Sequence, residues 1–183
     1  MKKQAAARDL LRKQRKEADV NTMKKEEIYQ YLNDHGIAFE VTEHQPIATW
    51  EELIRIELPH PEAEAKNLFV RDDKKRNYYV ITVNGDKRVD LKEFRKAHGL
   101  RPLSFASSDD LMTMLQLTPG EVTPLGLLND SACKIALFLD NAFKDKLIGI
   151  HPNDNTATVW MKTDDLVRII RAHGNIVEFV EIE

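Results

Sequence analysis

The central stretch of the chain reads KNLFVRDDKKRNYYVITV, residues 66–83. Both ends of this stretch are rich in β-branched and aromatic side chains, and the polar run 72–76 between them has the composition of a turn. The stretch therefore predicts a β-hairpin near the centre of a sheet, with Lys66 and Asn67 at the beginning of its first strand.

On either side of this hairpin the pattern alternates between helices and strands. Apolar spacing, capping residues and terminal glycines predict helices, with Asp90 and Ser108 as N-caps of the third and fourth; the predicted ranges are 23–35, 49–53, 90–98, 108–115 and 164–173. Further strands are predicted at 37–43, 134–140, 156–161 and 176–182. Because hairpins and helix-linked strands both occur, we expect one α/β domain with a mixed sheet flanked by helices.

Length and composition restrict the class of protein. A chain of 183 residues is long enough for one domain with a substantial core. It contains no run of about 18 apolar residues and no export signal, so we expect a cytoplasmic protein without a membrane segment. The single cysteine excludes an internal disulfide framework and a cysteine-based zinc cluster.

Charge divides the chain into a basic segment, residues 1–22, and a domain, residues 23–183. The segment carries seven basic and three acidic residues, a net charge of +4, whereas the whole chain carries −3. A basic arm of this kind is able to contact the phosphates of a nucleic acid. Such runs are more commonly solvated helical extensions, so both interpretations stay open.

Three separated segments carry residues suited to holding a nucleotide end. Lys66 offers an ammonium and Asn67 an amide, and each also has a plain role at a strand end or turn. Gly120 and Pro124 enclose a loop whose amides are able to approach a ligand, although Pro-Gly pairs also mark ordinary turns. His151 stands before a proline in a loop, where an imidazole is able to orient or deprotonate water near neutral pH.

These segments, in this order, resemble the YbaK and prolyl-tRNA-synthetase-associated editing domain family over about residues 23–183. The matching motifs are AKNLFVRD (65–72), TPGEVTPLGLLND (118–130) and HPNDNT (151–156). Within the family, the chain looks most like the free-standing deacylases that clear alanine from proline tRNA. The resemblance implies one α/β domain built on a mixed, partly barrel-like sheet.

The resemblance also implies roles for particular residues. Lys66 would hold the last phosphate or the terminal ribose of the tRNA, and His151 would orient the substrate or activate water. The substrate-binding set implied with them comprises Asn67, Gly120, Pro124, Gly126, Asn129 and Asn155, of which Asn129 and Asn155 are expected to brace their loops. Residues 44–50 and Phe69 would form the wall that limits the pocket. No metal or other cofactor is required for hydrolysis of an activated ester.

The implied function is therefore hydrolysis of mischarged alanyl-tRNA(Pro) in trans. Prolyl-tRNA synthetase and an elongation factor are both candidate partners besides the 3′ end of the tRNA. Two alternatives stay open: deacylation of another mischarged tRNA, carrying cysteine or serine, and a non-catalytic module of the same fold that binds a tRNA or a synthetase. Motifs for dinucleotides, nucleoside triphosphates, serine hydrolases and zinc proteases are absent from the sequence.

Overall fold

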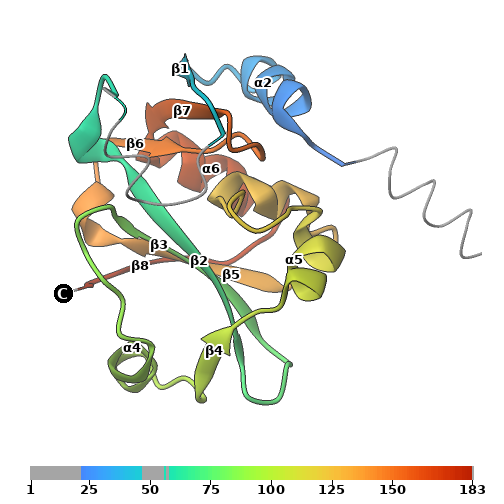
Figure 1. Cartoon of the computed structure of the whole chain (residues 1–183), viewed down its shortest axis with the longest axis vertical. Coiled ribbons are helices and arrows are strands. Elements are labelled where there is room, and N and C mark those ends of the chain that lie inside the picture. Colours follow the sequence, from blue (N-terminus) through green and yellow to red (C-terminus); the bar gives the residue numbers. More distant parts are fainter. Residues whose placement is uncertain (1–21, 47–55, 57, 183) are drawn as a thin grey trace, which may run out of the picture.

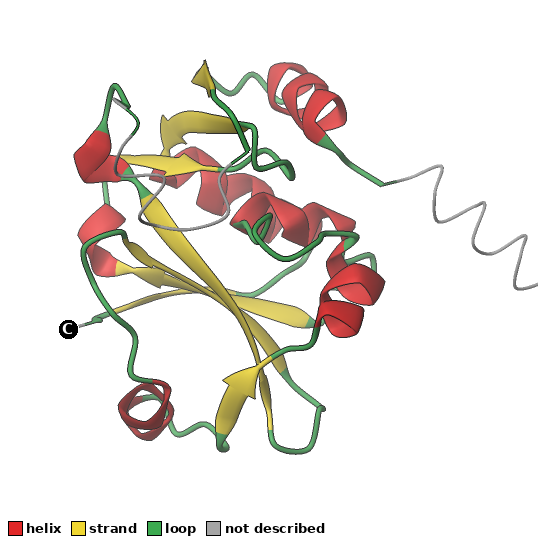
Figure 2. Ribbon diagram, in the orientation of Figure 1, coloured by secondary structure: helices red, strands yellow, loops and turns green. Residues whose placement is uncertain are grey.

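The computed structural model describes residues 22–46, 56 and 58–182. The predicted helix at 49–53 and nearly all of the basic segment 1–22 therefore lie outside the described residues. Within the described part, the strands form two sheets with helices on both sides, as Figures 1 and 2 show. No helix of this part is long and apolar enough to span a membrane.

The larger sheet has five strands and contains the predicted hairpin. Its order is β4 (Leu103–Phe105), β2 (Ala65–Asp72), β3 (Tyr78–Asn84), β5 (Ile135–Asp140) and β8 (Val177–Val180). β2 runs antiparallel to β3 and β4, whereas β3, β5 and β8 are parallel. The prediction of a mixed sheet in a single α/β domain is thus confirmed.

The smaller sheet has three antiparallel strands in the order β1 (Phe39–Glu43), β7 (Ala157–Lys162) and β6 (Leu147–Ile150). An isolated parallel bridge between Glu64 and Gly149 ties the beginning of β2 to β6. The expected barrel-like sheet is therefore two sheets joined at this bridge, and the described strands do not close into a barrel.

Helices cover the two sides of the larger sheet unequally. α2 (Lys25–Asp34), α5 (Ser108–Leu115), α6 (Thr163–His173) and the 3-10 helix η2 (Pro124–Asn129) contribute buried residues to the larger core. α4 (Leu91–Ala97) contributes Phe94 to a smaller core on the other side of the sheet. Figure 1 shows this separation of α4 from α5 and α6. Two further 3-10 turns, η1 (Pro61–Ala63) and η3 (Asn141–Phe143), lie beside β2 and β6 in sequence.

Two N-caps were predicted from the sequence: the one at Asp90 is confirmed, and the one at Ser108 is wrong by one residue. Asp90 caps α4, since its carboxylate accepts hydrogen bonds from the amides of Lys92 and Glu93. Ser107, not Ser108, caps α5, because its hydroxyl accepts from the amide of Asp110 while the Asp110 carboxylate accepts from the Ser107 amide. In this reciprocal pair the acid lies three positions after the cap, with two residues between them, and that spacing selects Ser107.

Candidate functional site

The bridge between Glu64 and Gly149 brings the predicted lysine and histidine to one face. Lys66 is two residues beyond Glu64, and His151 is two residues beyond Gly149 in the parallel direction. Side chains two apart on extended backbone project to the same face. Lys66, Glu64 and His151 therefore lie on a common face, which we call the β2–β6 face.

Gly149 allows the ring of Trp160 to pack directly against the backbone of β6. A Cβ at position 149 would collide with the ring of Trp160, which lies across the glycine. The ring is held from two other sides, because its Nε1 donates to Thr42 Oγ1 at 2.9 Å and the ring of His60 packs edge-on at 5.1 Å. These contacts hold the Trp160 ring against Gly149, two residues before His151.

His151 is a partly buried imidazole at the end of β6. Its Nδ1 atom is buried and has no hydrogen-bond partner among the described residues. Burial lowers the pKa of His151 to about 4, and the nearby ring of His44 acts in the same direction. The ring is therefore neutral at neutral pH, with a nitrogen able to interact with a ligand.

A group of polar side chains that sequence reasoning missed adjoins His151. Glu64 is only 4% exposed, Thr158 is fully buried, and the ring of His44 lies 6.0 Å from that of His151. Thr158 Oγ1 lies at hydrogen-bond distance, 3.2 Å, from His44 Nε2. Burial raises the pKa of Glu64 to about 8, and the neighbouring Thr158 side chain acts in the opposite direction. We call Glu64, Thr158, His44 and His151 the polar cluster. One sequence signal pointed to Glu64, namely its position two residues before Lys66 in an extended segment.

Lys66 and Asn67 lie on opposite faces of β2. Lys66 is half-buried, and its Nζ donates to the carbonyl of Lys87 at 2.9 Å. Lys87 is itself held by an ion pair with the fully buried Asp140 at 3.1 Å. Asn67 instead accepts a hydrogen bond from Thr82 Oγ1 at 2.8 Å, across the hairpin. Lys66 therefore lies on the β2–β6 face, and Asn67 lies on the opposite face of β2.

Phe69 shares the face of Asn67 and is a core residue. It is 5% exposed and stacks on the ring of Tyr78 at 5.7 Å. The alternation along β2 turns Phe69 and Lys66 to opposite faces, and the expected place of Phe69 in the wall of the pocket stays a prediction. Of the other predicted wall residues, His44 joins the polar cluster, whereas residues 47–50 lie outside the described residues.

The loop between Gly120 and Pro124 forms a turn that leads into η2. Gly120 is exposed with a φ of 95°, a conformation that favours glycine. Pro124 is buried at the first position of η2, following the N-cap Thr123. Gly126 is also buried, and a Cβ there would lie 2.7 Å from Leu117 Cδ1. Pro124 and Gly126 thus have packing roles, while Gly120 is accessible.

Asn129 and Asn155 occupy loop positions next to other elements. Asn129 accepts a hydrogen bond from the Met23 amide at 2.8 Å and donates to the Leu115 carbonyl at 2.9 Å. This side chain therefore connects the beginning of α2 to the end of α5. Asn155 is half-buried in the loop that joins β6 to β7.

Two surface pockets show which segments adjoin one another. A pocket of about 720 Å³ is lined by the turn residues Thr118 and Glu121, by Asn153 and Asp154 of the β6–β7 loop, and by the beginning of α2. The Gly120 turn and the loop that follows His151 therefore border the same pocket. Lys66 and His151 are not among its lining residues.

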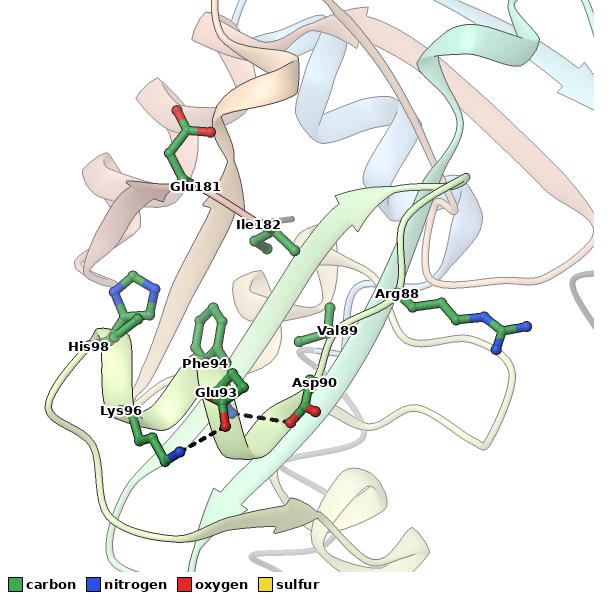
Figure 3. Close-up of a pocket in the computed structure, with 10 residues that line it drawn as sticks. Arg88, Val89, Asp90, Glu93, Phe94, Lys96, His98, Glu181 and Ile182 are labelled. Carbon is green, nitrogen blue, oxygen red and sulfur yellow. Dashed lines mark hydrogen bonds and ion pairs between the residues drawn. The ribbon is translucent and has the colours of Figure 1, made fainter.

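A second pocket, of about 730 Å³, lies between α4 and the end of β8 (Figure 3). In Figure 3, Lys96 pairs with Glu93, and Asp90 holds the amide of Glu93 as the helix cap. The residues that line this pocket include none of the predicted site residues. In the part of the chain that the structure describes, no three His, Cys, Asp or Glu side chains are grouped to hold a metal ion.

Comparison of the chain with known proteins shows the family to which it belongs. Residues 44–169 match the model of the aminoacyl-tRNA editing domain. The chain is 36% identical to the prolyl-tRNA editing protein ProX of Acetoanaerobium sticklandii, over 86% of this chain and 97% of that protein. It is 32% identical to the prolyl-tRNA synthetase associated domain-containing protein 1 of Mus musculus, over 81% and 90% of the two chains.

Two solved structures have a fold similar to that of this chain. A protein described as a candidate trans-editing enzyme for prolyl-tRNA synthetase superposes with a TM-score of 0.61 at 18% identity, over 79% of this chain and 86% of that one. The hypothetical protein APE2540 superposes with a TM-score of 0.62 at 17% identity, over 85% and 97%. The chain belongs to the aminoacyl-tRNA editing domain family, as its three motifs predict.

Proposed function

We propose that this protein is a trans-editing deacylase that hydrolyses alanyl-tRNA(Pro). The observation that carries the proposal is the common face of Lys66 and His151, in a chain similar to a prolyl-tRNA editing protein over nearly all of that protein's length. A cation and a neutral imidazole on one face suit a substrate with a phosphate at one end and an ester at the other.

The chemistry of proline selection explains the need for such an enzyme. Alanine is smaller than proline, so a proline pocket rejects it only weakly, and a missing methylene is worth about 1–3 kcal/mol. A second site that admits only the smaller side chain removes the wrong ester. This argument favours small side chains on proline tRNA, and we propose alanine, the smallest of the three candidates, as the main substrate.

Lys66 is the proposed contact to the tRNA end. Its ammonium donates to the Lys87 carbonyl, and we propose that it also donates to a phosphate or ribose oxygen of the tRNA end when the substrate binds. Because Lys87 is anchored on buried Asp140, the orientation of Lys66 depends on the larger sheet. A preorganised cation of this kind costs little reorganisation when the substrate binds.

His151 is proposed to orient the substrate rather than to deprotonate water. A general base works best when its pKa lies near the working pH, and the pKa of His151 is lowered to about 4. Relative to an ordinary histidine, proton capture by this ring is less favourable by about 3 kcal/mol. Its neutral nitrogen still accepts a hydrogen bond from the amino group, from a ribose hydroxyl or from the attacking water, with the terminal 2′-hydroxyl as the alternative activator.

The Gly120 turn is proposed to enclose the aminoacyl end of the substrate together with the loop that follows His151. It borders the pocket that contains Asn153 and Asp154, two and three residues after His151. The residues proposed to support this arrangement are Pro124, Gly126, Asn129 and Asn155. Asn67 would support Lys66 indirectly, through its hydrogen bond with Thr82 across the hairpin. Prolyl-tRNA synthetase is the proposed partner, since mischarged tRNA leaves that enzyme.

The test is deacylation by the purified full-length protein of alanyl-, cysteinyl-, seryl- and prolyl-tRNA(Pro), measured separately. We expect alanyl-tRNA(Pro) to be hydrolysed fastest and prolyl-tRNA(Pro) to be spared. Faster removal of cysteine or serine would reassign the substrate. Sparing of every ester would replace the deacylase by the non-catalytic binding module.

A further inference from the structure

The backbone of Met23 lies between two of the three sequence motifs and is held by an asparagine from each. Asn129, from the motif that contains Gly120, accepts a hydrogen bond from the Met23 amide at 2.8 Å. Asn153, from the loop after His151, donates from Nδ2 to the Met23 carbonyl oxygen at 2.6 Å. Asn129 Nδ2 lies 3.3 Å from the same oxygen. We call this arrangement of Asn129, Met23 and Asn153 the asparagine clamp.

The chemistry of the Met23 backbone fixes the orientation of both side-chain amides. A backbone amide only donates and a backbone carbonyl only accepts, so Asn129 turns Oδ1 and Asn153 turns Nδ2 toward Met23. The hydrogen bonds of α2 use neither group, because the first of them runs from the amide of Ile28 to the carbonyl of Lys24. The two asparagines therefore supply the partners that Met23 lacks in its own helix.

Asn153 has an unusual conformation for a buried side chain. It is 5% exposed, and its φ of 58° lies in the left-handed region that glycine and asparagine adopt most readily. Its Oδ1 atom is buried and has no hydrogen-bond partner among the described residues. An unpaired buried oxygen is unfavourable. The bond to Met23 is thus made although it leaves the other end of the same amide unpaired, and local strain of this kind gathers at functional sites.

A second contact ties the same loop to α2. Lys25, in the first turn of the helix, donates from Nζ to Thr156 Oγ1 at 3.1 Å. The beginning of α2 therefore holds the loop 151–156 at two points, Asn153 and Thr156. This loop borders the pocket that it shares with the turn at Gly120.

We propose that Asn153 is a positioning residue of the candidate site: its bond to Met23 joins the loop of His151 to the segment 118–130 and fixes the His151 ring relative to that segment. The role in hydrolysis rests on the proposed function, whereas the asparagine clamp does not. Without a donor at position 153, the loop keeps its contact at Thr156 and loses the one at Met23. The ring is then able to shift, and a displacement of about 1 Å is enough to lower a rate by about 10²-fold.

Two variants remove the bond in different ways. Asn153→Gly deletes the side chain and keeps a residue that readily adopts a positive φ. Asn153→Asp keeps the size of the side chain, but its carboxylate only accepts hydrogen bonds at neutral pH. Asp145→Gly is the matched control, because Asp145 has the same φ of 58° and is exposed in the turn before β6.

The first experiment reads the clamp without any substrate. The carbonyl carbon of Met23 and the ring nitrogens of His151 are followed by NMR in the full-length protein. We expect both signals to move in Asn153→Gly and Asn153→Asp, and to keep their wild-type positions in Asp145→Gly. A Met23 carbonyl signal that is unchanged in both Asn153 variants would show that the bond is not made in solution. An unchanged His151 ring would show that the bond does not position it, and either result overturns the proposal.

The second experiment reads single-turnover deacylation of alanyl-tRNA(Pro) in wild type and in the His151→Ala background. Each Asn153 variant should lower the rate constant at saturating enzyme about tenfold or more, with little change in the enzyme concentration for half the maximal rate. Asp145→Gly should change neither. If Asn153 acts through His151, the same substitution should cause no further loss in His151→Ala. An equal fractional loss in both backgrounds would reveal a purely structural role and refute the proposal.

The failure of this proposal is distinguishable from the failure of the proposed function. If the wild-type protein hydrolyses no ester, the proposed function fails, and the NMR signals of Met23 and His151 still decide whether the asparagine clamp positions the ring. Circular dichroism identifies a variant that does not fold, and the other Asn153 variant then serves in both experiments.

Discussion

Glu64 and Gly149 form a parallel bridge that ties the beginning of β2 to β6. The bridge determines which residues share a face, since Lys66 and His151 each lie two further steps along their segments. It also requires a glycine, because the ring of Trp160 occupies the space of a side chain at position 149. The candidate site thus depends on one backbone contact between the two sheets.

Gly149→Ala should destabilise the protein by about 1–3 kcal/mol, because the added methyl group displaces the fully packed Trp160 ring. Urea unfolding followed by Trp fluorescence measures the change. Gly36→Ala is a contrasting variant: its Cβ has open space, but its φ of 64° lies in the left-handed region, so it reports backbone strain without a steric clash. A Gly149→Ala protein as stable as wild type would show that Trp160 does not constrain position 149.

Lys66→Ala should weaken binding of a tRNA 3′ end and lessen its dependence on salt. If the ammonium contacts a phosphate, the slope of log K against log [salt] should fall by about 0.7 for single-stranded acceptor nucleotides. Lys92→Ala, which removes an exposed lysine on α4, is the control and should leave the slope unchanged. A slope unaltered by Lys66→Ala would favour a contact to the ribose instead of a phosphate.

The low pKa of His151 predicts a loss of stability in mild acid. Burial lowers this pKa from 6.5 to about 4, so between these values the unfolded chain binds a proton that the folded chain does not. Stability therefore falls as the pH decreases through this window. From pH 7 to 5 the loss from this group should be about 1–2 kcal/mol, the pKa difference traversed converted at 1.36 kcal/mol per unit.

His151→Gln, which has no titrating ring, should lose correspondingly less stability over that range. Denaturant unfolding of both proteins at pH 7 and pH 5 gives the comparison. The aspartates whose pKa values are lowered by hydrogen bonds, such as Asp90, contribute equally to both proteins and cancel in the difference. Identical losses would mean that the ring is protonated in the folded protein.

The sequence was sufficient for the hairpin at 66–83 and for α4 and α6, because their alternation, helical spacing and caps are local signals. It missed β4, a three-residue strand that pairs with the distant β2, and β6, a four-residue strand that pairs with the next strand, β7. The motif residues Lys66 and His151 were recognisable one by one. Their common face was not, since it follows from the bridge between Glu64 and Gly149, residues 85 positions apart. Apart from its position two residues before Lys66, Glu64 resembles an ordinary surface acid in the sequence, and its burial is seen only in the structure.

The most direct test of the account is a double-mutant cycle on single-turnover hydrolysis of alanyl-tRNA(Pro), with wild type, Lys66→Ala, His151→Ala and the combined variant. If both residues act on one substrate end, each single variant should lose about 10²-fold or more, and the double variant should lose clearly less than the product of the two losses. Single variants that hydrolyse the ester at the wild-type rate, or losses that simply multiply, would contradict a shared site on the β2–β6 face.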